Sequence, residues 1–307
     1  MTEFIHQPVM VSEVLSYLDP KPGETIVDCT VGGGGHARRI WERMQETGRL
    51  IGFDQDKDAL AKAREVLGGE AVLVQENFRS LGQVLAELAP EGVDGVFFDL
   101  GVSSPQLDWG ERGFSYNIDA PLDMRMNQDS PLTAEEIVNT YSQRELTKII
   151  ASYGEERWAS RIAKFIVEAR QRKRIETTGQ LVELILAAIP AGARRKGGHP
   201  ARRTFQALRI AVNDELGALK EGLESAISSL LPGGRIVVLS YHSLEDRIVK
   251  QTFASWAGKG PEPVAEKLEL LTKKPLLPSE EEVAQNPRAR SAKMRAARCV
   301  LKPRKGE

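Results

Sequence analysis

A cluster of glycines follows a short β-rich stretch near the start of the chain, in the string Asp28-Cys-Thr-Val-Gly-Gly-Gly-Gly-His36. Glycines at such a point let the backbone approach a ligand closely, and Gly32, Gly34 and Ala37 also fit the dinucleotide pattern G-x-G-x-x-A. Asp54 ends the next β-rich stretch, where a carboxylate can accept both hydroxyls of an adenosine ribose. This pattern predicts a site for a nucleoside cofactor, either NAD or S-adenosylmethionine. The alternative interpretation, a tight turn that binds no ligand, is less favoured.

Three polar features favour S-adenosylmethionine over NAD. Asp28 precedes the glycines, where the ammonium of a methionine group needs a counter-charge nearby, and Glu76-Asn77-Phe78 follows the third β-rich stretch, where it can flank an adenine. The fourth stretch leads into Asp99-Leu-Gly-Val-Ser-Ser-Pro-Gln106. Dehydrogenases need nothing so polar there, whereas amino-methyltransferases place the acceptors of a substrate amine at this point. The candidate catalytic residues are Asp99, Ser103, Ser104 and Pro105.

These residues need a scaffold of alternating strands and helices. Short β-rich runs at 25–29, 50–54, 71–74 and 93–100 are separated by helical patterns at 36–46, 58–67 and 80–88. Such alternation predicts βαβ units with a parallel sheet, in which right-handed crossovers bring every strand's carboxyl end to one ligand-binding edge. The fold class is therefore predicted to be α/β, with a doubly wound sheet.

The alternation stops after residue 100, which predicts an inserted helical domain. Helical patterns follow at 133–140, 143–153, 155–170 and 177–189, and the sheet pattern resumes with one long helix at 204–230 and strands at 235–240 and 297–301. We predict a core formed by residues 1–108 and 209–307, and an inserted helical domain at 109–208.

Composition limits the class of protein. The 307 residues include 41% hydrophobic and 28% charged residues, which suits a globular protein with a proper core and excludes a disordered or fibrous chain. No apolar run has the length of about 20 residues that a membrane span needs, and no secretory signal is evident. The two cysteines and four histidines lack zinc-ligand spacing, so we expect a cytoplasmic protein without a metal.

The net charge of −1 hides two basic segments. The first contains ten Lys and Arg against Glu176 and Glu183: 170, 172, 173, 174, 194, 195, 196, 202, 203 and 209. The second, from Arg288 to Glu307, contains eight basic residues against Glu307 alone. Charge runs more often belong to a solvated face, but two such segments beside a catalytic edge favour a polyanionic partner, most simply a nucleic acid.

Several long strings resemble the ribosomal RNA small subunit methyltransferase H family. They are residues 27–36, 99–108, 111–115, 121–126, 153–157, 203–207, 241–247 and 286–290, and they extend over most of the chain. The resemblance implies a class I (Rossmann-like) methyltransferase, dependent on S-adenosylmethionine, that methylates the exocyclic N4 amine of one cytidine in the decoding region of 16S rRNA. By motif position it also implies cofactor contacts at Gly34, Gly35, His36, Asp54, Phe78, Asp99 and Gln106. With an RNA substrate implied, we predict that the insertion at 109–208 recognises RNA.

One motif departs from the broader amino-methyltransferases. Their acidic/polar-Pro-Pro-aromatic motif is Ser103-Ser-Pro-Gln106 here, so the aromatic that stacks on the target base must be another residue, with Trp109, Phe114 and Tyr116 as the candidates. Three alternatives stay open at this stage: an amino-methyltransferase acting on DNA, an NAD oxidoreductase, and a non-catalytic RNA-binding factor. Naked rRNA and the assembled small subunit are both possible substrates, and both a monomer and a homodimer are possible.

Overall fold

The computed structural model describes residues 8–102, 112–194, 198–260, 263–264 and 267–300. The chain divides into two compact units: a core unit of Met1–Gly101 and Leu216–Glu307, and an insertion of Val102–Glu215. The predicted limits of the insertion, 109 and 208, lie inside this second unit. The reason is packing, because Val102 and the apolar side chains of the helix that ends the insertion, including Leu208 and Val212, belong to the hydrophobic core of the insertion.

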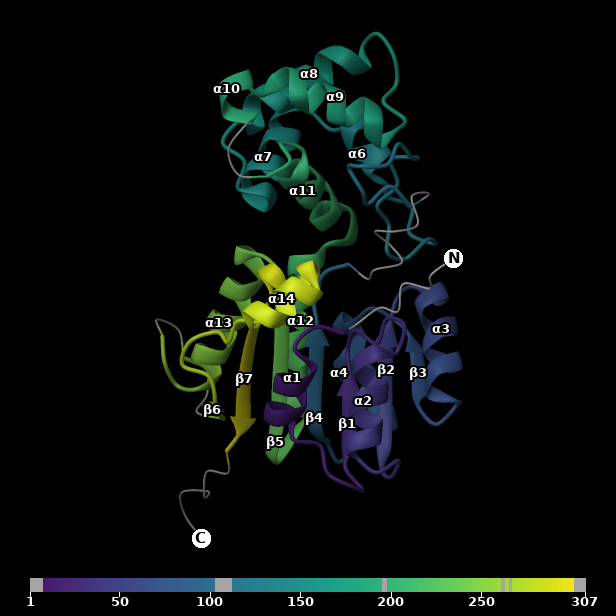
Figure 1. Ribbon diagram of the computed structural model, residues 1–307, viewed down its shortest axis with the longest axis vertical. Helices are drawn as coiled ribbons and strands as arrows, with labels where there is room; N and C mark the ends of the chain where they lie inside the picture. Colours follow the sequence, from purple (N-terminus) through teal and green to yellow (C-terminus); the bar gives the residue numbers. More distant parts are fainter. Residues whose placement is uncertain (1–7, 103–111, 195–197, 261–262, 265–266, 301–307) are drawn as a thin grey trace. The chain divides into compact units, whose positions relative to one another are not determined.

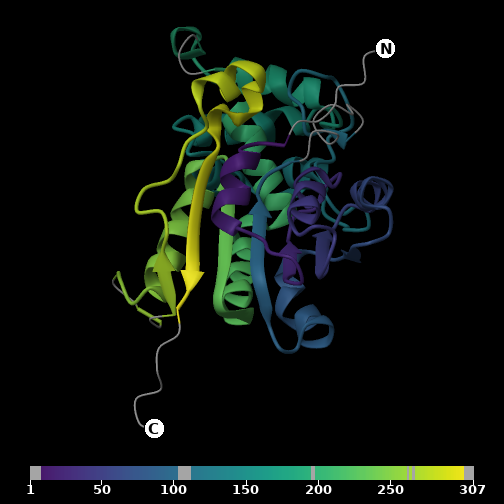
Figure 2. The ribbon, with the colours of Figure 1, turned by 60° about the horizontal axis from the view of Figure 1, so that its bottom comes forward.

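The core unit contains a seven-stranded sheet in the order β3-β2-β1-β4-β5-β7-β6. Its strands are β1 (Thr25–Asp28), β2 (Arg49–Asp54), β3 (Val72–Gln75), β4 (Val93–Asp99), β5 (Leu230–Ser240), β6 (Leu268–Leu270) and β7 (Lys293–Cys299). The first five are parallel, whereas β7 pairs antiparallel with both β5 and β6. Figures 1 and 2 show β7, in yellow, pointing in the direction opposite to β4. The prediction of a doubly wound α/β sheet is confirmed.

Helices cover both faces of the sheet because successive strand residues face opposite ways. Ile26 and Phe97 pack with the helices α1 (Val11–Leu18), α2 (Gly35–Arg43) and α3 (Lys57–Leu67). Val27 and Phe98 pack on the other face with α4 (Leu81–Leu88), α12 (Glu215–Ser229) and α13 (Ser243–Trp256). In Figure 1, α1 and α2 lie in front of the strands, and the fainter α4 and α12 lie behind them. Within the described ranges, none of the helices combines the length and apolar character that crossing a bilayer requires.

The single long helix predicted at 204–230 is wrong. The structure has α11 (Arg202–Asn213) and α12, separated by Asp214 in the left-handed conformation with φ 46°. The break follows from the role of Asn213, whose side chain accepts from the Met126 N–H and donates to the Met124 carbonyl, both at 2.8 Å. Aspartate is one of the few residues that tolerate the left-handed conformation, so the helix can end there at low cost.

The end of the chain also differs from the prediction. The final strand was placed at 297–301, but β7 begins at Lys293 and ends at Cys299. Charged residues interrupt the apolar pattern that predicts a buried strand. One of them, Arg295, is nevertheless only 8% exposed, because its Nε donates to Asp246 Oδ1 at 2.7 Å. The structure also has α13, β6, α14 (Glu280–Gln285) and α1, which the sequence pattern did not predict.

The insertion is a helical unit with its own core. It contains α6 (Ala134–Thr140), α7 (Gln143–Gly154), α8 (Ala159–Arg170), α9 (Thr178–Ala188), α10 (Ala191–Arg194) and α11. Capping boxes begin α7 at Ser142 and α9 at Thr177, as their sequences allow. The predicted helix at 155–170 begins only at Ala159, because Glu155 is left-handed, with φ 48°.

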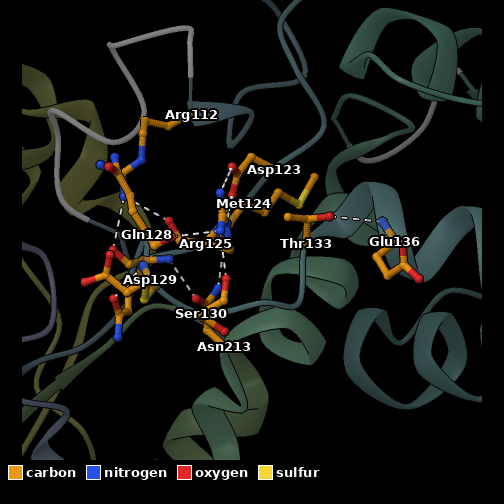
Figure 3. A network of polar contacts seen from close by, with 12 residues as sticks. Arg112, Asp123, Met124, Arg125, Gln128, Asp129, Ser130, Thr133, Glu136 and Asn213 are labelled. Atoms are coloured by element: carbon orange, nitrogen blue, oxygen red, sulfur yellow. Dashed lines mark hydrogen bonds and ion pairs between the residues drawn. The ribbon is translucent and has the colours of Figure 1, made fainter.

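A polar network fixes the loop that leads into α6 (Figure 3). The Arg125 guanidinium donates to both carboxylate oxygens of Asp123, at 2.8 and 2.7 Å, and to the carbonyls of Gln128 and Ser130, both at 2.7 Å. Arg112, 9% exposed, donates to the carbonyl of Arg125 at 2.9 Å. These bonds satisfy the backbone of a long segment without regular structure, so the network is architectural.

Candidate active site

Carboxylates gather at one edge of the sheet because parallel strands end together. Asp28, Asp54 and Asp99 are the last residues of β1, β2 and β4, and Tyr241 directly follows β5. The register places β1 between β2 and β4, and it pairs Asp99 with Leu239 of β5. This is the edge at which ligands of doubly wound sheets bind.

The glycine turn between β1 and α2 is held from two sides. Gly34 has φ +85°, and a Cβ there would lie 3.3 Å from the Cα of Ala63 in α3, so only glycine fits without strain. Asp54 anchors the turn: its Oδ2 accepts from the Gly32 N–H at 3.0 Å, and its Oδ1 accepts from the Asp56 N–H at 2.9 Å. The Asp54 side chain stays partly accessible, and burial raises its pKa to about 6.

Asp28 is fully buried beneath the turn. Its Oδ1 accepts from the Thr30 N–H at 3.0 Å, while its Oδ2 has no hydrogen-bond partner among the described residues. Burial raises the pKa of Asp28 to about 7, and the nearby carboxylates of Asp99 and Asp54 act in the same direction. Buried carboxylates are normally paired with a positive charge or a hydrogen-bond donor, and this oxygen has neither among the described residues. The site is therefore suited to a positively charged ligand group.

This raised pKa gives a stability prediction for the protein without ligand. A carboxyl group whose pKa is higher folded than unfolded binds an extra proton in the folded state between about pH 4 and 7, so its contribution to stability is lost as pH rises through that window. The variant Asp28→Asn has no carboxyl group at this position, so its stability does not show this loss. We expect its free energy of unfolding, relative to the unsubstituted protein, to rise by about 2–3 kcal/mol between pH 5 and pH 8, measured by denaturant titration. A difference that does not change with pH would contradict the assignment.

Asp99 has a defined position at the centre of the edge. Its backbone N–H donates to the Thr30 hydroxyl at 2.6 Å, its Oδ1 accepts from the Tyr241 hydroxyl at 2.7 Å, and its Oδ2 lies 3.4 Å from Nδ1 of His36. The Asp99 side chain is 22% exposed, so part of the carboxylate still faces outward. A carboxylate held this way can accept further hydrogen bonds from a ligand.

Phe78 follows β3 and starts the 3-10 helix Phe78–Ser80. Its ring packs edge-on against Phe98, with centroids 5.5 Å apart, and a Cβ on Gly222 of α12 would lie 2.7 Å from the ring. The neighbouring Asn77 donates from Nδ2 to Gln55 Oε1 at 3.2 Å, which connects this segment with the end of β2. The ring is therefore fixed in place and only partly buried.

The structure brings most of the predicted cofactor residues together. Gly34, Gly35 and His36 form the start of α2, and Asp54 and Asp99 end the adjacent strands. The His36 side chain itself is 7% exposed and engaged with the protein, so a ligand would meet mainly the backbone there. Ser103, Ser104, Pro105 and Gln106 lie outside the described residues.

Two of the three candidate stacking aromatics are described. Phe114 is 6% exposed within the core of the insertion, so neither of its faces is free to take a base. Tyr116 is partly exposed and stacks on His199, with ring centroids 4.6 Å apart. Trp109 lies outside the described residues.

The sequence interpretation missed Tyr241. The string Tyr241-His-Ser-Leu-Glu-Asp directly follows β5, so its place at the carboxyl edge was available as a signal. Here His242 is the N-cap of α13, with its Nδ1 accepting from the Glu245 N–H at 3.4 Å. It thus has a structural role, and the adjacent tyrosine is the residue that contacts Asp99.

The strand order with an antiparallel β7, a glycine turn after β1 and acidic residues ending β1, β2 and β4 define a methyltransferase of the class I, Rossmann-like type. The model of the MraW methylase family matches residues 3–300, and the chain belongs to this family.

Two relatives are similar over nearly their whole length. The ribosomal RNA small subunit methyltransferase H of Symbiobacterium thermophilum is 55% identical over 319 residues, covering 99% of this chain and 98% of the relative. The protein of the same name from Heliobacterium modesticaldum is 54% identical over 312 residues, covering 96% and 98%. Among solved structures, an rRNA methylase from Streptococcus thermophilus is a distant likeness, at 11% identity and a TM-score of 0.43 over 97% of this chain and 99% of that one.

The methyl donor of this enzyme is S-adenosylmethionine, and the residues present fit it. The unpartnered Asp28 oxygen suits its ammonium, the accessible Asp54 carboxylate suits its ribose hydroxyls, and the glycine turn leaves room for backbone contacts.

Proposed function

We propose that this enzyme methylates the exocyclic N4 amine of one cytidine in the decoding region of 16S rRNA, in the cytoplasm. The observation that carries the proposal is the near full-length similarity to two relatives named ribosomal RNA small subunit methyltransferase H. The carboxylate of Asp99, fixed at the sheet edge but still partly exposed, supports an amine as the methyl acceptor.

The bound cofactor supplies an electrophilic methyl group on a sulfonium. The protein has to hold the donor and acceptor in line and exclude water, since orientation and desolvation provide most of the rate. We propose that Asp28 pairs with the ammonium and that Asp54 accepts from the ribose hydroxyls. Phe78 flanks the adenine, with Gln106 as a further cofactor contact.

Cytosine's exocyclic amine is a weak nucleophile because its lone pair is conjugated with the ring. We propose that the Asp99 carboxylate accepts an amine hydrogen and helps to turn the lone pair toward the methyl group. The other proposed acceptors are Ser103 and the Ser104 carbonyl, in the segment that continues with Pro105. The methylated amine becomes acidic as its positive charge develops, so a strong general base is not required. The target base must leave its stack to reach such an edge.

The insertion is the part that we propose contacts RNA phosphates. Several of its cations are used internally: Arg170 bonds the Val138 carbonyl at 2.7 Å, Arg174 pairs with Glu135 at 2.6 Å, and Arg209 pairs with Glu215 at 2.7 Å. By contrast, Arg172, Lys173 and Arg202 are exposed, with no side-chain bond to another described residue. The described cations of β7 in the second basic segment are paired with Asp246 or Glu269, so that segment offers less free charge.

The triple substitution of Arg172, Lys173 and Arg202 by Ala tests this role. Each phosphate contact releases counterions from the RNA on binding, so a variant with fewer contacts releases fewer of them. The magnitude of the slope of log affinity for 16S rRNA against log salt should therefore fall by up to about 3. The control replaces three exposed cations of the core unit, Arg43, Lys57 and Lys259, and should leave the slope nearly unchanged. Equal slopes for both triple variants would assign the basic segment to the solvated surface.

The substrate class is tested with labelled cofactor. The protein is incubated with small ribosomal subunits, naked 16S rRNA and duplex DNA, and the transferred label is counted. Transfer to either RNA substrate with none to DNA supports the proposal. Transfer to DNA alone would favour a DNA amino-methyltransferase, and RNA binding without any transfer would favour a non-catalytic assembly factor.

A further inference from the structure

The two oxygens of Asp99 face different side chains. Oδ1 accepts from the Tyr241 hydroxyl at 2.7 Å, and Oδ2 faces Nδ1 of His36 at 3.4 Å. A carboxylate oxygen has two lone-pair sites, so each oxygen keeps capacity for one more donor. The hydrogen bond from Tyr241 therefore fixes the rotation of the carboxylate without using up its acceptors.

Tyr241 is itself held by its own segment. Its backbone N–H donates to Glu245 Oε2 at 2.8 Å, and this carboxylate also closes the capping box at the start of α13. Burial, followed by the neighbouring Asp99, raises the pKa of Tyr241 well above its ordinary value. At neutral pH the phenol therefore keeps its proton and donates it to the carboxylate.

His36 lies beside the other oxygen of Asp99, and the N-terminal segment sets the orientation of its ring. Its Nε2 lies 2.8 Å from the Val9 carbonyl, which can only accept, so Nε2 is the donor of that bond. The ring also packs against Phe97, with centroids 4.8 Å apart. The next N–H of the segment, that of Met10, donates to Glu282 Oε1 of α14 at 2.6 Å.

We propose that Tyr241 is a positioning residue for methyl transfer, acting through Asp99. Its hydroxyl holds the carboxylate in the rotamer that directs the unused lone pairs of Oδ1 and Oδ2 toward the acceptor amine. This inference rests on the proposed role of Asp99 in binding the amine. Small errors in the placement of an acceptor are costly for an in-line transfer, because the rate depends on the population of aligned complexes.

The test is a double-mutant cycle in single-turnover methyl transfer to small ribosomal subunits. Tyr241→Phe keeps the ring and removes the hydroxyl, so the rate constant should fall about 10- to 100-fold while the Kd for S-adenosylmethionine stays within about 2-fold. In the Asp99→Ala background the same substitution should change the rate by less than about 2-fold, because the residue through which it acts is missing. Tyr17→Phe, which removes a phenol from α1 on the same unit, is the matched control and should be neutral.

Two results would overturn the inference: an unchanged rate in Tyr241→Phe, or an equal loss with and without Asp99. If Tyr241→Phe does not fold, 3-fluorotyrosine is placed at position 241, where it keeps the hydroxyl. Its ¹⁹F resonance should shift on Asp99→Ala but not on Asp94→Asn. The absence of a shift on Asp99→Ala would also overturn the inference. Absence of transfer by the unsubstituted protein would instead contradict the proposed function, so the two failures are distinguishable.

Discussion

Replacing Asp99 by Asn is expected to lower kcat for methyl transfer by about 100-fold or more, with RNA affinity changed by less than about 2-fold. The substitution keeps the shape of the side chain but turns one acceptor oxygen into an N–H donor, facing either the Tyr241 hydroxyl or His36. An amine hydrogen then meets a donor instead of an acceptor. Loss of one preorganised polar contact of this kind costs about 10²- to 10³-fold in rate.

Asp94→Asn is the matched control, because Asp94 lies near the other end of the same strand. Its Oδ2 accepts from the Thr25 N–H at 2.8 Å, far along β4 from the catalytic edge. This variant should keep its kcat within about 2-fold once folded protein is quantified. Equal losses of turnover and RNA binding in Asp99→Asn would argue against a role for Asp99 in the reaction.

Asp54→Ala is expected to weaken S-adenosylmethionine binding by about 1–3 kcal/mol, measured by calorimetry, because buried ribose hydroxyls lose their acceptor. The structure adds a second reason for a loss. Asp54 also accepts from the N–H groups of Gly32 and Asp56, so its removal loosens the glycine turn.

Asp58→Ala removes an exposed carboxylate four residues further on, in the first turn of α3, and should leave the cofactor Kd unchanged. A folded Asp54→Ala variant with unchanged affinity for S-adenosylmethionine would contradict the cofactor assignment.

The central strands β1, β2 and β4 were predictable because they are buried on both faces of the sheet. The predicted runs 25–29, 50–54 and 93–100 agree with β1, β2 and β4 to within a residue or so at each end. Their apolar residues need no alternation, and the breakers that bound them are local signals. Local pattern and global fold agree in this part of the chain.

The failures occur where a long-range contact decides the local structure. The Asn213 side chain bonds the backbone of residues near 125, and only that contact explains why the helical pattern at 204–230 breaks at Asp214. Likewise, Arg295 can be buried in β7 because Asp246 of α13 neutralises it. Neither partner is visible from sequence periodicity.

The candidate site shows the same division. The positions of Asp28, Asp54 and Asp99 followed from strand ends alone, because parallel strands share one carboxyl edge. The contact between Asp99 and Tyr241 depends on rotamers and on the register of β4 with β5, and no local pattern specifies those.

In the proposed reaction the methyl group arrives on the N4 atom of one cytidine. The direct measurement is mass spectrometry of nuclease-digested 16S rRNA after small subunits have been incubated with the protein and isotope-labelled S-adenosylmethionine. We expect labelled N4-methylcytidine in a single oligonucleotide of the decoding region, absent when Asp99→Asn is used. Label on a ring carbon, on a ribose oxygen or on a nucleotide outside the decoding region would contradict it.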